Sequence, residues 1–222
     1  MEFAPAWSAL DLPWRECFNL AWESFRAGSV PVGAVLVDAT GAVVATGRNL
    51  RNEVAPPGRL GGSNLAHAEI NTLAGLPSGH YADHILYSTL EPCLLCTAAA
   101  RYSHIGTLRY AAEDPMWRGI ERIPELNVEL ARRWPRREGP LGGGWQDLST
   151  VLHLLALVER GPAAAPAVAA HRDAVPELLR LAQRLAGEPA VRLRAMALPE
   201  AFGALGPQLP GWGSAALSTV DA

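Results

Sequence analysis

The sequence predicts an α/β fold, a sheet with helices on its faces, followed by a helical C-terminal extension. Between about residues 12 and 131, strand-length segments rich in Val and Ala alternate with segments whose apolar residues follow helical spacing. Such alternation is typical of a sheet covered by helices. From about residue 145 onward the patterns are helical only. The composition, 49% hydrophobic and 18% charged, is ordinary for a globular protein.

The first part of this pattern predicts one helix and a hairpin. Over residues 12–28 the apolar side chains form an amphipathic stripe, which ends at Gly28. Two Val-rich segments, 30–38 and 41–49, follow it and are separated by a short turn at Thr40-Gly41. We therefore expect two adjacent buried strands after the first helix. Cys17 lies on the apolar stripe, where a small core residue is expected.

The middle of the chain continues the alternation. The expected elements are, in order, a loop over 50–64, a helix over 65–75, a strand over 84–90, a helix over 92–104, a strand over 105–114 and a possible fifth strand over 125–131. Gly75 and Pro77 stop the first of these helices. Pro92 opens the second, at a position where a missing N–H costs nothing.

The C-terminal region divides into two helices and a linker. We expect helices over 145–160 and 172–187, joined by a Pro- and Ala-rich linker over 161–170. No motif that carries chemistry is visible in this region. The chain is therefore predicted to consist of a domain at 1–144 and a helical extension at 145–222.

Charge and targeting signals narrow the class of protein. The net charge is −3, and all 19 basic residues are arginines, a balance that does not favour extensive binding to phosphate backbones. The arginines of 132–137 could form a local patch, but a solvated segment is the preferred interpretation. There is no apolar run of about 18 residues and no secretory signal pattern. Three cysteines do not make a disulfide scaffold. We expect a cytoplasmic protein without membrane association.

Cys93 and Cys96 form a Cys-x-x-Cys motif at the start of a predicted helix. This spacing places both sulfurs on one face, one turn apart, and a helix N-terminus favours thiolates. A redox pair, a metal site and two ordinary buried residues all fit the motif taken alone.

His67 and Glu69 favour the metal interpretation. They begin the preceding predicted helix, and a crossover through one strand would bring both helix starts to the same end of the sheet. One histidine and two cysteines suit zinc and leave a fourth position for water, whose protons Glu69 could handle. Positions i and i+2 of a regular helix point apart, so both side chains can face the metal only in the first turn. A closed structural zinc site, completed by Cys17 or another histidine, and a thiol-redox protein remain the alternatives to an enzyme.

Other candidate residues have weaker support. The histidines without motif context, each more simply a surface or interior residue, are His80, His84, His104, His153 and His171. Trp117 could stack on a base or belong to the core.

The motifs together resemble the cytidine/deoxycytidylate deaminase superfamily. The resembling segments are "PVGAVLVD", "GRN" ending at Asn49, "AHAEI", "TLEPCLLC" and "RYAAED", which lie within about residues 10–130. A H-x-E motif followed by P-C-x-x-C is the signature of zinc deaminases that act on bases. The nearest similarity is to the branch of tRNA adenosine deaminases and guanine deaminases. The resemblance implies a three-layer α/β/α core with a mixed five-stranded sheet.

The resemblance also assigns roles to individual residues. It implies that His67, Cys93 and Cys96 bind Zn²⁺, that Glu69 is the catalytic proton shuttle, and that Asn49 and Asp114 contact the substrate. Residues 1–144 would be the zinc-dependent deaminase domain, and a homodimer is expected because the superfamily is commonly oligomeric.

The substrate is the least determined part of the prediction. The residues before His67, after Cys96 and after Asp114 depart from the pattern of the tRNA enzymes, and the extension is foreign to their short chains. We therefore expect hydrolytic deamination of a small nucleobase or nucleoside with release of ammonia. A tRNA-specific adenosine deaminase, converting adenosine to inosine, is the alternative.

Overall fold

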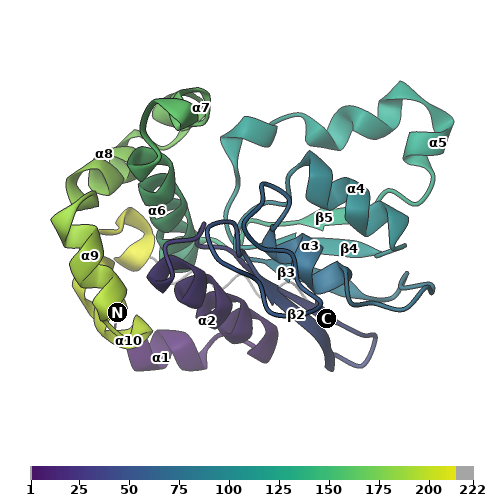
Figure 1. Ribbon diagram of the computed structural model, residues 1–222, viewed down its shortest axis with the longest axis horizontal. Helices are drawn as coiled ribbons and strands as arrows, with labels where there is room; N and C mark the ends of the chain where they lie inside the picture. Colours follow the sequence, from purple (N-terminus) through teal and green to yellow (C-terminus); the bar gives the residue numbers. More distant parts are fainter. Residues whose placement is uncertain (1, 214–222) are drawn as a thin grey trace.

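The computed structural model describes residues 2–213 and contains a five-stranded mixed sheet in the order β2-β1-β3-β4-β5 (Figure 1). The strands are β1 (Gly33–Val37), β2 (Val43–Arg48), β3 (Ile85–Ser88), β4 (Thr107–Tyr110) and β5 (Arg136–Glu138). β1 is antiparallel to both β2 and β3, while β3, β4 and β5 run parallel. The hairpin and the crossover expected from the sequence are both present.

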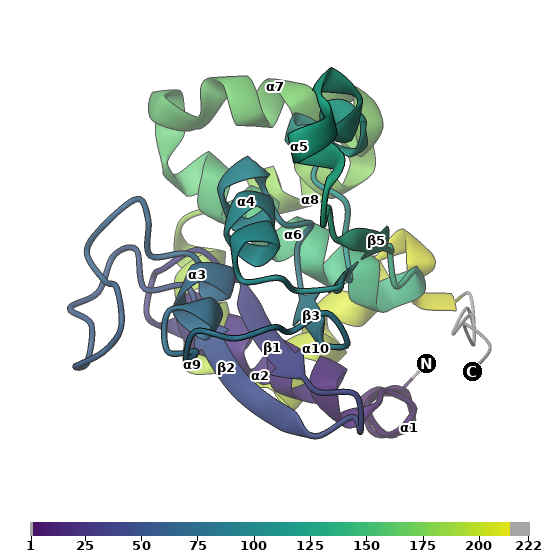
Figure 2. The ribbon, with the colours of Figure 1, turned by 90° about the vertical axis from the view of Figure 1, so that its right-hand side faces the viewer.

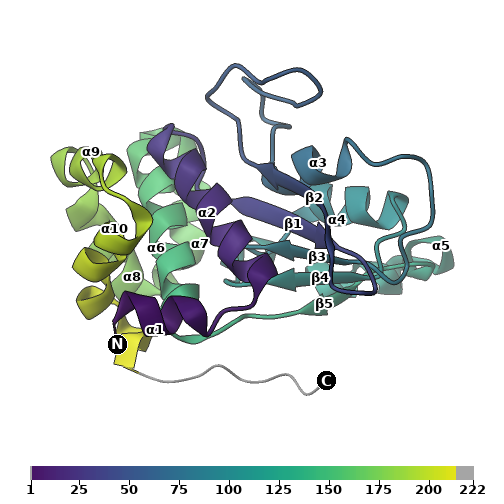
Figure 3. The same cartoon turned by 90° about the horizontal axis from the view of Figure 1, so that it is seen from below.

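Helices cover both faces of the sheet, which confirms the predicted α/β/α layers (Figure 3). Along β1, Ala34 and Leu36 pack into a core with α3 (Ala68–Leu73) and α4 (Leu94–Tyr102). Val35 and Val37 point to the opposite face and pack into a larger core with α2 (Leu12–Arg26) and α6 (Gly143–Glu159). This alternation follows from the two-residue period of a strand whose two faces are both buried.

Two glycines allow helices to lie directly on the sheet. A Cβ atom at Gly33 would lie 2.2 Å from the carbonyl oxygen of Cys17 on α2. At Gly47 of β2 a Cβ atom would lie 2.5 Å from both the Ala68 carbonyl oxygen and the Thr72 nitrogen of α3. Because neither site has room for a side chain, both helices are fixed at close range to the sheet.

The extension packs against the sheet-facing helices. Its helices are α6, α7 (Ala165–Ala174), α8 (Pro176–Leu185), α9 (Glu188–Ala195) and α10 (Leu198–Leu205), and the N-terminal α1 (Phe3–Ser8) lies against them (Figures 1 and 2). Phe18 of α2 contacts Trp145, with ring centroids 4.7 Å apart, and Trp22 Nε1 donates a hydrogen bond to the Met196 carbonyl. The extension therefore shares the larger core. The division at residue 144 remains a sequence prediction, and residues 214–222 lie outside the described part.

The structure corrects the expected fifth strand. Residues 125–131 belong to a 3₁₀ helix (Ile120–Leu126) and to α5 (Val128–Ala131), which begins where the Asn127 side chain accepts a hydrogen bond from Leu130 N–H. Two of the apolar residues of this segment, Leu126 and Val128, are 75% and 73% exposed, and Leu130 is only half-buried, so the segment lacks the buried face that a strand of the sheet would have. The fifth strand is β5, whose polar side chains are paired with neighbouring elements rather than buried in apolar surroundings.

The linker expected at 161–170 is also wrong. This segment forms a 3₁₀ helix (Gly161–Ala164) and the first part of α7. Pro162 and Pro166 lie in the first turns of these two elements, where proline is tolerated. No helix within residues 2–213 has the length and apolar character that crossing a membrane requires.

Candidate active site

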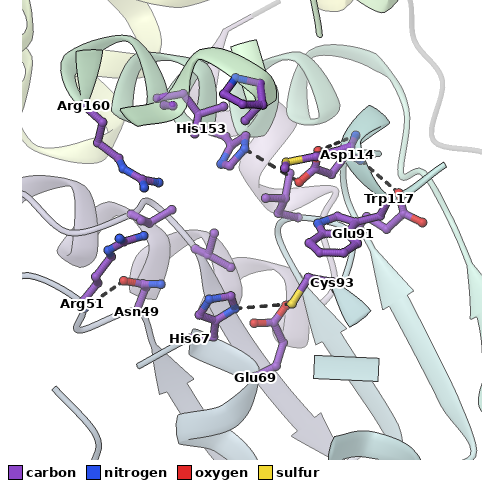
Figure 4. Close-up of a pocket in the computed structure, with 18 of the residues that line it drawn as sticks. Asn49, Arg51, His67, Glu69, Glu91, Cys93, Asp114, Trp117, His153 and Arg160 are labelled. Carbon is purple, nitrogen blue, oxygen red and sulfur yellow. Dashed lines mark hydrogen bonds and ion pairs between the residues drawn. The ribbon is translucent and has the colours of Figure 1, made fainter. Parts of the chain in front are cut away.

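Two helix N-termini bring the predicted metal ligands together. His67 is the N-cap of α3 and Cys93 is the N-cap of α4, both with extended backbone (ψ 153° and 176°). His67 precedes the first helical residue and has extended backbone. Its side chain therefore does not follow the helical rotation that separates positions i and i+2, and it can face the same side as Glu69. The first-turn placement that the sequence requires is thus realised (Figure 4).

The three side chains have the separations that one tetrahedral cation requires. His67 Nδ1 lies 3.6 Å from Cys93 Sγ and 3.3 Å from Cys96 Sγ, and the two sulfurs are 3.4 Å apart. Ligands at zinc bond lengths and tetrahedral angles lie about 3.6–3.8 Å from one another. A zinc ion therefore fits with small adjustments. Within residues 2–213, this ligand group contains three residues and no fourth His, Cys, Asp or Glu, which disfavours a closed structural site.

The pKa values of the two thiols are shifted in opposite directions. Hydrogen bonding from Cys96, together with the His67 ring, lowers the pKa of Cys93 to about 4. The same contact with Cys93, reinforced by burial, raises the pKa of Cys96. One thiolate is therefore formed before any cation binds, and it accepts the Cys96 N–H at the helix start.

Glu69 lies beside the ligands in the first turn of α3. It is 4% exposed, accepts a hydrogen bond from Ser88 Oγ at 3.1 Å, and its other carboxylate oxygen lies 3.4 Å from Cys96 Sγ. Burial, followed by the charge of Cys93, raises the pKa of this carboxyl group. A raised pKa suits a group that must both accept and donate a proton near neutral pH.

His67, Glu69 and Cys93 border a cavity of about 270 Å³, and Cys96 lies fully buried behind them. Asn49, at the end of β2, is 3% exposed and lines this cavity. Its Oδ1 accepts the Arg51 N–H at 3.0 Å, so the side chain shapes the turn, and within the described residues no partner is recorded for its amide nitrogen. The amide is thus available as a hydrogen-bond donor on the cavity wall.

Asp114 lines the opposite wall, where two histidines of the extension face its carboxylate. Its carboxylate oxygens lie 3.9 Å from His153 Nε2 and 3.6 Å from His171 Nε2, and Oδ1 also accepts the Met116 N–H at 3.0 Å. The His171 Nδ1 bonds to the Ala167 carbonyl at 2.8 Å. Asp114 therefore joins the core to α6 and α7 at the pocket.

The extension contributes much of the pocket, although no motif in its sequence marks the residues that do so. Its lining residues are His153, Leu157, Arg160, Ala163, Ala164, Pro166 and Ala167. Trp117 also lines the cavity and is half-buried. Of these, Trp117 and His153 were considered from the sequence, His153 only as a histidine without motif context, because the extension carries isolated polar residues without a recognisable motif.

Two of the four arginines of 132–137 are engaged within the protein, whereas Arg132 and Arg133 are exposed. Arg137 pairs with Glu91 at 2.7 Å and donates to Thr97 Oγ1, and Arg136 donates to Thr107 Oγ1. Glu91 in turn accepts the Asp114 N–H at 3.0 Å. Glu91 and Asp114, which belong to this network, lie on the right-hand side of Figure 4.

Comparison with known proteins identifies the family. Residues 11–112 match the family described as "Cytidine and deoxycytidylate deaminase zinc-binding region". A tRNA-specific adenosine deaminase of Rickettsia bellii is 32% identical over 112 residues, which are 48% of this chain and 72% of that protein. A tRNA(Ile)-lysidine synthase of Deinococcus radiodurans is 35% identical over 132 residues, 58% of this chain but 21% of that protein. The chain thus spans about a fifth of the latter relative.

A similar solved structure has a lower sequence identity to the chain than these two relatives. Guanine deaminase from Nitrosomonas europaea is 21% identical, with a TM-score of 0.46, and the match covers 66% of this chain and 85% of that one. The family match includes the zinc-binding motifs, and the Rickettsia protein is matched over most of its length. The chain therefore belongs to the cytidine and deoxycytidylate deaminase zinc-binding family.

Proposed function

We propose that the protein is a zinc-dependent hydrolytic deaminase that releases ammonia from a nucleobase-type amine. The observation that supports this most strongly is that His67 and Cys93, two members of the three-residue ligand group, border the cavity together with Glu69. Three protein ligands with an adjacent buried carboxylate are typical of a catalytic zinc site, whereas a structural site is closed by four. A redox role for the thiols would leave His67 and Glu69 without a purpose.

The chain's own residues would divide the reaction among them. A zinc ion held by His67, Cys93 and Cys96 would supply a water of lowered pKa. Glu69 would carry two protons in turn: one from that water to a ring nitrogen, and one from the hydroxyl group added to the base carbon to the departing amine. Ser88 orients the carboxylate through its hydrogen bond. Asn49 and Asp114 are proposed to contact the substrate, Asn49 through its free amide.

A small substrate is our first proposal for the identity of the base. In its favour, the segment from His153 to Ala167 forms one wall of the cavity, which suits a compact ligand. The arginines of β5 are engaged in ion pairs and hydrogen bonds, so they offer little to an RNA backbone.

Adenosine in tRNA is the second candidate. Several relatives, including the Rickettsia bellii protein, are tRNA-specific adenosine deaminases, and they give no support to our expectation that tRNA is the lesser possibility. We further propose a cytoplasmic location, consistent with three unpaired cysteines, and a homodimer.

The test is a substrate panel assayed for ammonia release. The panel contains guanine, guanosine, cytosine, cytidine, adenosine and an anticodon stem-loop that contains adenosine, each offered to the zinc-loaded protein and to Glu69→Gln as the blank. Turnover of a base or nucleoside by the parent alone supports the first proposal. Turnover of the stem-loop alone, falling steeply with salt, supports the tRNA alternative. No turnover of any substrate would contradict the proposed activity.

A further inference from the structure

Two arginines face each other at the rim of the pocket. Arg51 follows Asn49 in the loop after β2, and Arg160 follows the last residue of α6. Both line the cavity, and their guanidinium groups point toward one another on the left side of Figure 4. One comes from the family domain and the other from the extension.

The remaining charged residues of the cavity have partners within the protein. Glu91 pairs with Arg137, Glu69 accepts a hydrogen bond from Ser88, and the Asp114 carboxylate faces His153 and His171. By contrast, within residues 2–213 neither Arg51 nor Arg160 forms an ion pair or a side-chain hydrogen bond. The rim therefore carries two positive charges that no carboxylate of residues 2–213 pairs with.

Their mutual position is unfavourable unless an anion joins them. Burial and then the charge of Arg160 lower the pKa of Arg51, as expected for like charges at close range. Arg51 is half-buried, so water screens it less than it screens the exposed Arg160. Guanidinium groups form paired hydrogen bonds to phosphate oxygens, and two of them can hold one phosphate from both sides.

We propose that Arg51 and Arg160 form a phosphate subsite, so that the substrate presented to the zinc centre carries a phosphate group. The statement about the substrate rests on the proposed deaminase function, but phosphate binding at the subsite can be measured without turnover. The base would enter toward His67 and Glu69, and its phosphate would remain at the rim between the two arginines. The phosphate can belong to a free nucleoside monophosphate or to an RNA backbone.

The first test is equilibrium binding of inorganic phosphate to the zinc-loaded protein, measured by titration calorimetry. Loss of one charged partner should weaken binding by about tenfold or more in Arg51→Ala and in Arg160→Ala. The matched control is Arg192→Ala, which removes the same charge from α9, where Arg192 is exposed (70%) and paired only with the exposed Glu188. Metal analysis and melting curves establish that each variant is folded and zinc-loaded. Equal phosphate affinity in all four proteins, or no binding by the parent, would overturn the subsite.

The second test uses turnover to identify the phosphate's source. Each nucleoside of the panel is compared with its 5′-monophosphate, and both with the anticodon stem-loop. A higher kcat/KM for the monophosphate that disappears in Arg160→Ala identifies a free nucleotide. Turnover of RNA alone identifies the RNA backbone as the source, provided that the slope of log(kcat/KM) against log[salt] is smaller by about one in Arg160→Ala, as expected for one lost phosphate contact.

The subsite and the proposed activity fail in different ways. Arginine-dependent phosphate binding without ammonia release from any compound supports the subsite and contradicts the deaminase. Deamination of unphosphorylated bases at equal rates in all variants, without phosphate binding, supports the deaminase and overturns the subsite.

Discussion

At the residue scale, zinc affinity depends on side chains that are set by helix ends. The Cys93 thiol accepts the Cys96 N–H and has a pKa of about 4, so it offers a thiolate at neutral pH. Replacing this sulfur by a hydroxyl removes the charge that a divalent cation needs. Cys93→Ser should therefore lose most of its zinc, measured by elemental analysis of the purified protein. Cys17→Ser, which alters a thiol of the core on α2, is the control, and full zinc content in Cys93→Ser would contradict the assignment.

Glu69 is expected to affect the rate but not the metal. Its carboxylate contacts Ser88 and Cys96, and a glutamine has nearly the same shape. Glu69→Gln should keep zinc and the melting temperature close to those of the parent, while kcat falls by about 10²–10⁴-fold because the proton shuttle is gone. Activity within about threefold of the parent would rule out the shuttle.

His153 should make stability depend on acid. Burial lowers its pKa from 6.5 to about 4, and the groups that face it are Asp114, His171 and Arg160. Between these two pH values the unfolded chain binds a proton that the folded protein does not, so stability decreases as pH falls through this window. The loss has an upper limit of about 3 kcal/mol. Urea unfolding at pH 7 and pH 4.5 should show a smaller decrease for His153→Gln than for the parent; equal decreases would contradict this.

Candidate site residues that belong to a sequence motif could be proposed from the sequence. Pocket residues that belong to no motif could not. His67, Glu69, Cys93 and Cys96 lie in two short motifs that favour metal chemistry when taken together, although the Cys-x-x-Cys motif alone does not. His153 and Arg160 have no such spacing, because they reach the pocket only through the packing of α6 on the sheet.

At the element scale, the contact between β2 and α3 positions the active site. α3 begins directly after His67 and carries Glu69, and its backbone touches Gly47. In Gly47→Ala the new methyl group would overlap the Ala68 carbonyl and the Thr72 nitrogen, so the helix must move. We expect a loss of about 1–3 kcal/mol of stability together with reduced zinc content. Gly75→Ala is the control, since no atom lies within 4 Å of a Cβ there. A fully zinc-loaded Gly47→Ala protein would show that this contact is not needed.

Helices and strands could be predicted from the sequence where one or both of their faces are buried, because burial produces the apolar pattern. β1 and α2 are buried on the faces that their patterns indicate. In the segment 125–131 apolar and polar residues alternate as in a strand, but the segment pairs with no strand of the sheet. β5 instead pairs with β4 through its backbone and through the ion pair between Arg109 of β4 and Glu138, 2.5 Å apart. The prolines of 161–170 suggested a linker although they begin helical turns.

At the scale of the whole molecule, the extension and the core share apolar packing. Truncation after residue 144 would remove Trp145 from Phe18 and strip the cover from the outer face of α2. A chain of 1–144 should therefore aggregate or remain unfolded, as judged by solubility and circular dichroism. In the full chain, Trp145→Ala should cost about 3–5 kcal/mol of stability. A soluble, active and monomeric 1–144 fragment would contradict both this expectation and the proposed homodimer.

The pocket has two walls of separate origin. Reactive groups come from the motif-bearing segments, and the opposing surface comes from a stretch beyond the family match at 11–112. Point substitutions on the cavity side of the C-terminal helices can therefore change which molecules enter the pocket without altering the candidate metal ligands, provided that the apolar residues shared with α2 are kept.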